Sequence, residues 1–218
     1  MQDPARTVLR HLVATLAYRA AKVLRDTPDG FDTGAIGPTT RTPMRIVAHV
    51  ADLMTWAVTM ARGNAAWKAE GGNDWSVEVE RFFDRLAALD LELAGDGFSV
   101  SWAEPLIQGP LADALTHVGQ LALLRGVAGA PVRPESYARA EIVAGRVGPE
   151  QATPRGVRRR RQRPAMTTGA SPDLVRVALR FPLSLGALHS KQGQEAVRPS
   201  GSKADYSRID PIVCSFCS

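Results

Sequence analysis

The clearest structural signal in this chain is PMRIVAHVADLMTWAVTMAR, residues 43–62. Its apolar residues recur at steps of three and four, which places them on one face of an α-helix. They are Ile46, Val50, Leu53, Ala57 and Met60. Thr42 precedes the stretch as an N-cap, and Pro43 takes the first helical position, where no N–H is needed. The stretch is therefore predicted to be an amphipathic helix with one face buried.

Three other segments among the first 150 residues repeat this helical period. They are residues 7–25, 76–94 and 110–128. Ser76 is a predicted N-cap, and Gly129 follows the last segment as a stop. Because no convincing strand period occurs, the predicted fold class is all-α, a four-helix bundle. A short amphipathic segment, residues 135–144, predicts one extra C-terminal helix.

Positive charge is concentrated at the end of the chain. The 218 residues carry 27 Lys and Arg against 22 Asp and Glu, a net charge of +5. Residues 1–150 hold 15 of the basic and 18 of the acidic residues, a net charge of −3, whereas residues 151–218 have a net charge of +8. We therefore predict a mildly acidic helical domain at 1–150 and a disordered, basic, low-complexity tail at 151–218.

The tail has two features that can be read as functional. Residues 155–164, RGVRRRRQRP, can attract phosphates, but no aromatic residue is interleaved there for base stacking. Nucleic acid is therefore not an expected partner. Cys214 and Cys217 form a lone C-x-x-C pair, which is weak evidence for zinc or thiol chemistry. We interpret both features as parts of an extension without a site.

The first 150 residues favour a cytoplasmic location. The N-terminal residues carry scattered charges and lack the apolar block of a secretory signal. No run of about 18 or more apolar residues occurs, so no membrane span and no membrane partner are expected. The predicted domain contains no cysteine, which excludes disulfides and cysteine-bound metals within it.

Two of the four histidines lie on the buried edges of predicted helices. His49 and His117 each follow an apolar helical position by three residues and precede another by four. Asp113 stands one turn before His117, so the two side chains share a helical face. Two imidazoles and a carboxylate from two helices can coordinate a divalent ion and leave a coordination position open. The alternative, commoner for a single histidine on an apolar face, is a hydrogen-bonded core residue.

Two helical stretches resemble signatures of the DinB/YfiT-like superfamily. Residues 115–125, LTHVGQLALLR, place a histidine before x-Gly-Gln, apolar residues and an arginine, as the last helix of that family does. Residues 42–52, TPMRIVAHVAD, place a histidine after the apolar start of the second helix. Residues 141–151, EIVAGRVGPEQ, look like the C-terminal segment of many members. The resemblance covers roughly residues 5–151 and implies a DinB-like four-helix bundle.

The resemblance also implies a divalent metal ion, such as Zn, Ni, Mn or Fe, held by three residues that are usually all histidines. His49 matches the ligand on the second helix, and His117 matches the last ligand. Asp113 stands where the family has its middle histidine. A carboxylate is a legitimate ligand for these metals, so the site either persists as two histidines and one aspartate or has decayed.

Gln120 and Arg125 are weaker candidates near the same site. Gln120 is interpreted either as a hydrogen-bond partner of a metal ligand or as a residue on a solvated face. Arg125 either belongs to the pocket or serves as a favourable cation near a helix C-terminus. The tryptophans are core or rim residues, some of which could line a pocket above the metal. They are Trp56, Trp67, Trp75 and Trp102.

Assigned activities in the family are thiol-dependent transfer or isomerisation, and hydrolysis has been proposed for some members. The resemblance therefore predicts a metal-dependent transferase, isomerase or hydrolase for an unknown small molecule, with a thiol as a candidate partner, and it allows a homodimer. The alternative is a non-catalytic binding or stress-response module with a degenerate metal site. A third, less favoured alternative is nucleic-acid binding through the basic tail, which predicts strong salt dependence.

Overall fold

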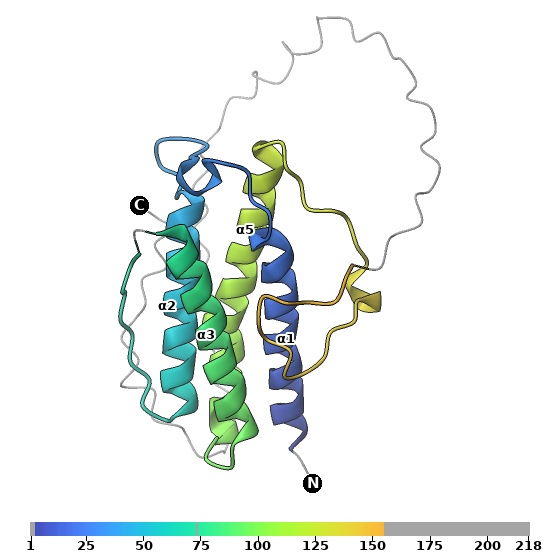
Figure 1. Ribbon diagram of the computed structural model, residues 1–218. Helices are drawn as coiled ribbons and strands as arrows, with labels where there is room; N and C mark the ends of the chain where they lie inside the picture. The colour runs from blue at the N-terminus through green and yellow to red at the C-terminus, as the bar shows by residue number, and fades with distance from the viewer. Residues whose placement is uncertain (1–2, 73, 155–218) are drawn as a thin grey trace, which may run out of the picture. The chain divides into compact units, whose positions relative to one another are not determined.

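The fold is all-α in the computed structural model, which describes residues 3–72 and 74–154 (Figure 1). Within these ranges four long helices contact one another in a closed ring, and no strand occurs. None of the described helices combines the length and the apolar character needed to cross a bilayer. The basic run and the C-x-x-C pair of the predicted tail lie outside the described residues.

The first two long helices begin at capping residues next to a proline. α1 covers Pro4–Leu24, and the carboxylate of its N-cap Asp3 accepts the N–H of Ala5. α2 covers Pro43–Ala61, and the hydroxyl of Thr42 accepts the N–H of Arg45. The bounds predicted for α2 are confirmed within one residue. The loop between the two helices contains one 3-10 turn, η1 (Phe31–Thr33).

The third long helix begins earlier than its sequence suggested. α3 covers Trp75–Ala94, and its N-cap is Asp74 rather than the predicted Ser76. The Asp74 carboxylate accepts the N–H of Val77 at 3.0 Å and also the Ser76 hydroxyl at 2.6 Å. Asp74 therefore satisfies a free backbone donor of the first turn, which is the function of an N-cap.

The last long helix has a kinked approach. After η2 (Val100–Trp102), the chain forms α4 (Ala103–Leu106) and the π-turn η3 (Ile107–Leu111), which lead directly into α5 (Ala112–Val127). Pro110 lies inside this stretch, and Gly109 before it has non-helical angles, φ −92° and ψ −105°. A proline removes one helical hydrogen bond and disfavours the α conformation of the preceding residue, which explains the kink.

Ion pairs show how neighbouring helices are oriented. Arg10 of α1 and Asp90 near the end of α3 pair at 2.8 Å, so these two helices run antiparallel. Arg62 and Glu92 pair at 2.7 Å and join the C-terminal ends of α2 and α3, which therefore run parallel (Figure 1). Because α2 and α3 run in the same direction, the connection at residues 62–74 must run back along their whole length to reach the start of α3. This crossover segment lies beside α2 and contributes to the candidate site described below.

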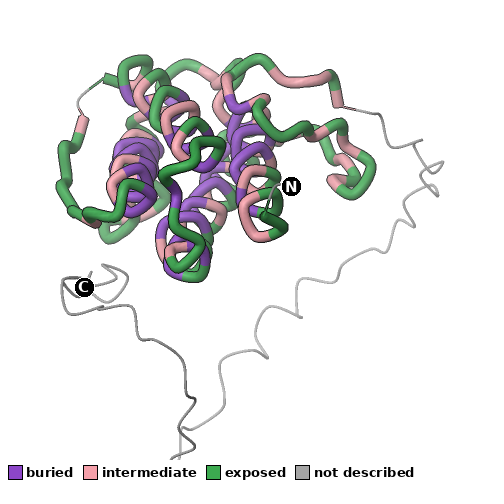
Figure 2. The backbone as a smooth tube through the Cα atoms, turned by 90° about the horizontal axis from the view of Figure 1, so that it is seen from below, coloured by how far each residue is buried: buried purple, intermediate pink, exposed green. Residues whose placement is uncertain are grey.

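The inward faces of the four helices form one apolar core (Figure 2). Each long helix contributes side chains that are almost fully buried, at the spacing of a helical stripe. Among the largest of them are Leu9, Leu16, Leu53, Met60, Phe82, Leu86 and Leu111. Burial of this continuous stripe explains why these segments are helical together, because short helices gain most of their stability from packing.

The prediction of an extra C-terminal helix at residues 135–144 is wrong. The structure has only a 3-10 turn there, η4 (Tyr137–Arg139), in an otherwise irregular segment. The segment is fixed to α1 by side chains instead: the Glu135 carboxylate accepts the Tyr18 hydroxyl and Lys22 Nζ, both at 2.8 Å. The Tyr137 ring packs edge-on against Tyr18, with ring centres 6.3 Å apart. These contacts lie one turn apart on α1 and hold the segment in a conformation that is not α-helical.

Candidate metal centre

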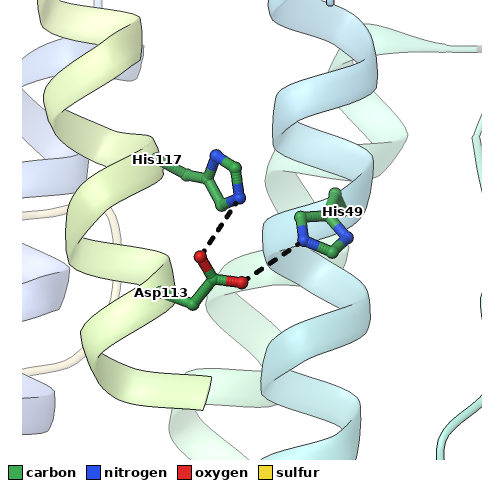
Figure 3. A group of neighbouring side chains, drawn as sticks. All are labelled: His49, Asp113 and His117. Carbon is green, nitrogen blue, oxygen red and sulfur yellow. Dashed lines mark ion pairs between the residues drawn. The ribbon is translucent and has the colours of Figure 1, made fainter. Parts of the chain in front are cut away.

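His49, Asp113 and His117 meet between α2 and α5 (Figure 3). His49 Nε2 lies 3.6 Å from one Asp113 carboxylate oxygen, and His117 Nε2 lies 3.5 Å from the other. The two imidazole rings are perpendicular, with centres 4.9 Å apart. One donor atom from each residue can be chosen so that all three lie within 4.8 Å of one another. Two helices that are far apart in the sequence thus bring three potential ligand side chains together.

The spacing of these atoms is compatible with a shared cation. A good N–H···O bond has its heavy atoms about 2.7–3.2 Å apart, which is shorter than both nitrogen–oxygen distances here. Two ligands held about 2.1 Å from a tetrahedral ion lie roughly 3.4 Å apart. The donor set, two imidazoles and a carboxylate, suits Zn, Mn, Fe or Ni. The three residues can therefore hold a divalent ion without a large rearrangement.

Gln120 fixes the protonation pattern of His117. The Gln120 side-chain oxygen lies 2.7 Å from His117 Nδ1. An amide oxygen only accepts hydrogen bonds, so Nδ1 carries a proton, and in the neutral ring Nε2 keeps its lone pair. The His117 side chain is only 1% exposed. This contact gives Gln120 the first of its two predicted roles, a partner of the candidate ligand, and not that of a solvated residue.

The surroundings of His49 favour its neutral form. Burial lowers the pKa of His49, the charges of His117 and Arg41 lower it further, and Asp113 opposes them. A neutral imidazole is the form that binds metals. The Trp67 ring lies edge-on to the His49 ring, with centres 5.9 Å apart, and makes a similar contact with Trp56. Apolar rings therefore cover the candidate site on the His49 side.

The crossover segment holds Trp67 in this place by two anchors on α2. The N–H of Ala66 donates to the Thr59 hydroxyl oxygen at 3.0 Å, and the N–H of Glu70 donates to Asp52 Oδ1 at 3.1 Å. Trp67 lies between these two anchor points in the sequence. Sequence reasoning named Trp67 only as one of several rim candidates, because its position depends on hydrogen bonds between a loop and a distant helix.

A cleft of about 430 Å³ opens on the other side of His49. Its lining consists of Arg41, Arg45, Ala48, His49, Asp52, Gly71 and Gly72. Asp52 in its wall is bonded by Arg81 at 2.7 Å, and Arg81 also pairs with Glu78 at 2.6 Å. Gly72 packs so closely on the Glu78 side chain that no Cβ would fit there. The sequence analysis missed this cleft, because residues from two separate segments form it.

Arg125 lies at the C-terminal ends of α1 and α5, where it has a structural role. Its buried guanidinium donates to the backbone carbonyls of Val23, Arg25 and Asp26 at the end of α1, and to that of Ala130 after α5. All these partners are backbone carbonyls at or just after the end of a helix. This position agrees with the helix-end alternative for Arg125 and not with a place among the candidate ligands.

Neither protein-family models, nor curated proteins, nor solved structures match this chain. What the site can do therefore follows from its own atoms and their surroundings. These are three ligand side chains, a glutamine that orients one of them, a tryptophan over another, and an adjoining cleft with two arginines.

Proposed function

We propose that residues 3–154 form a four-helix bundle of the DinB/YfiT-like kind that binds one divalent metal ion through His49, Asp113 and His117. The observation that carries the proposal is the meeting of these three donors from α2 and α5 within 4.8 Å. The order of the motifs in the sequence supports the same family, since the second helix supplies one ligand and the last helix supplies two.

Two features of the local geometry support a metal site. Both Nε2 atoms face the same carboxylate, at 3.5 and 3.6 Å. His117 uses its other nitrogen for Gln120, the arrangement that orients metal-binding histidines.

We further propose that the domain is a metal-dependent transferase, isomerase or hydrolase for a small molecule. A divalent ion with three protein ligands lowers the pKa of a water or thiol in its open position and so makes a nucleophile at neutral pH. The protein side chains have separate tasks in this scheme. Gln120 orients the His117 ring, and Trp67 covers one side of the His49 ring. Asp113, 36% exposed, leaves that side of the site open.

A non-catalytic helical module with a degenerate site is the second candidate, and one observation favours it. Asp113 stands in the position that the resembled family gives to a histidine. If the site is degenerate, Asp113→Asn leaves the response of the protein to metals unchanged. In a functioning site this substitution removes the only negative ligand and weakens binding of a divalent cation.

Thermal unfolding with and without added Zn, Mn or Ni tests the proposed site. A metal at about a hundred times its Kd stabilises a folded protein by roughly 3 kcal/mol, so the unfolding temperature should rise. His49→Ala and His117→Ala should abolish this rise, and Asp113→Asn should reduce it. His11→Ala, an exposed histidine on α1, and Asp84→Asn on α3 are matched controls that should keep it. An equal rise in wild type and in both histidine variants would sink the proposal.

A further inference from the structure

The cleft beside His49 carries two arginines whose guanidinium groups pair with no described residue. Arg41 and Arg45 both line the cleft. Within residues 3–72 and 74–154, no hydrogen bond or ion pair engages either guanidinium. The only acidic residue in the lining is Asp52. Its Oδ1 is already used by Arg81 and by the N–H of Glu70.

The location of the arginines at the start of α2 makes the potential there more positive. Arg45 lies in the first turn of α2, which contains no acidic residue, and Arg41 precedes the N-cap Thr42. The N-terminal end of a helix has a partial positive charge and ordinarily attracts acidic side chains. Two cations at this end repel the helix dipole and each other. An anion bound in the cleft would offset this repulsion.

His49 connects the cleft to the candidate metal centre. The same side chain lines the cleft and lies 3.6 Å from Asp113. Arg41 is close enough for its charge to lower the pKa of His49. A molecule in the cleft would therefore contact His49, one of the three candidate ligands. A volume of about 430 Å³ is within the range of small-molecule sites.

We infer that the cleft is the substrate site of this protein and that Arg41 and Arg45 bind an oxyanion group of a small organic substrate, a carboxylate or a phosphate. Guanidinium groups form paired, charge-assisted hydrogen bonds with both kinds of oxyanion. The arginines fix one end of the substrate, and the rest of the molecule reaches toward His49. The inference rests on the proposed function, since it assigns the anion as the substrate of the metal centre.

Titration calorimetry with malonate and, separately, with inorganic phosphate tests the inference on the full chain. Each probe is titrated into metal-free and metal-loaded wild-type protein and into the double variant Arg41→Gln/Arg45→Gln. Arg85→Gln is the matched control, because Arg85 is an exposed arginine on α3 that pairs with no described residue. Circular dichroism checks that all variants keep the helical content of the wild type.

The expected result is saturable binding that the double variant weakens about tenfold or more and that Arg85→Gln leaves unchanged. The probe that binds more tightly identifies the oxyanion. Equal binding by wild type and double variant would overturn the inference, as would no saturable binding of either probe to wild type. Arginine-dependent binding in a chain that takes up no metal would refute the metal centre and leave the anion site standing. Metal uptake together with anion binding that does not depend on either arginine would refute the anion site and leave the metal centre standing.

Discussion

The Gln120 side chain determines which nitrogen of His117 faces Asp113. Its oxygen is 2.7 Å from Nδ1, and the proton of the neutral ring therefore lies between them. Without this acceptor the proton could move to Nε2, which would remove the lone pair that a metal needs. Gln120 is thus a positioning residue, which acts on a metal through the histidine that it contacts.

Gln120→Leu should weaken metal affinity about 10- to 100-fold, because removal of an oriented partner of a histidine ligand has effects of this size. Gln120→Glu is the matched variant, since its carboxylate still accepts the Nδ1 proton, and it should bind metal nearly as well as wild type. A competition titration against a chelator of known affinity measures both. Wild-type affinity in Gln120→Leu would show that the contact has no role in binding.

The lowered pKa of His49 makes the metal-free protein less stable in acid. Burial and the charges of His117 and Arg41 lower the pKa in the folded state. In the unfolded chain the residue returns to its ordinary pKa of about 6.5. The unfolded state then binds more protons than the folded state below that pH, so the free energy of unfolding decreases as the pH falls through about 6.5.

Urea unfolding of the metal-free protein at neutral pH and at about pH 5 measures this dependence. The loss of stability between the two conditions should be smaller in His49→Gln than in wild type, and His11→Gln should behave like wild type. A loss of the same size in wild type and His49→Gln would contradict the expected role of His49 in the acid sensitivity.

Arg125 joins the C-terminal ends of α1 and α5, two neighbouring helices that run parallel. Its guanidinium is 8% exposed and donates to carbonyls from both ends. Carbonyls in the last turn of a helix have no partner within the helix, so a side chain from a neighbour that reaches several of them connects the two elements. Arg125 has this role at the end of α5 that is remote from the kink at Gly109.

Arg125→Ala should reduce the free energy of unfolding by about 2–4 kcal/mol, because it leaves buried carbonyls without donors. Arg125→Lys should recover only part of this loss, since an ammonium group cannot reach acceptors in several directions at once. Urea unfolding measures both, and metal binding per folded chain should stay at the wild-type level. A selective loss of metal binding without a loss of stability would instead place Arg125 in the site.

The helices that bury a regular apolar stripe were predictable, and the irregular elements were not. Residues 42–62 carry a cap, a proline and five stripe positions, and α2 matches them. The kinked approach to α5 could not be predicted from the helical period of apolar residues. Pro110 interrupts that period, although the chain remains helical on both sides of it. The segment near Glu135 has helical amphipathicity, but its contacts with Tyr18 and Lys22 on α1 determine its conformation instead.

The whole domain brings together site residues that the sequence could only suggest one at a time. His49, Asp113 and His117 could be proposed because helical spacing fixes the face on which each lies. The roles of Trp67 and of the two cleft arginines were not predictable, since they depend on the course of the crossover segment at residues 62–74. The net charge of +5 does not describe the domain that contains the candidate site, because residues 1–150 have a net charge of −3.

A site shared between α2 and α5 exists only when the domain is folded, so metal binding and folding are linked. The amount of metal bound per chain tests the central proposal most directly. Purified protein is stripped with a chelator, dialysed against Zn, Mn or Ni and analysed by mass spectrometry, beside the double variant His49→Ala/His117→Ala. We expect about one ion per wild-type chain, as one three-ligand site requires, and almost none in the variant. Equal metal content in the two proteins, or none in either, would contradict the proposed metal centre.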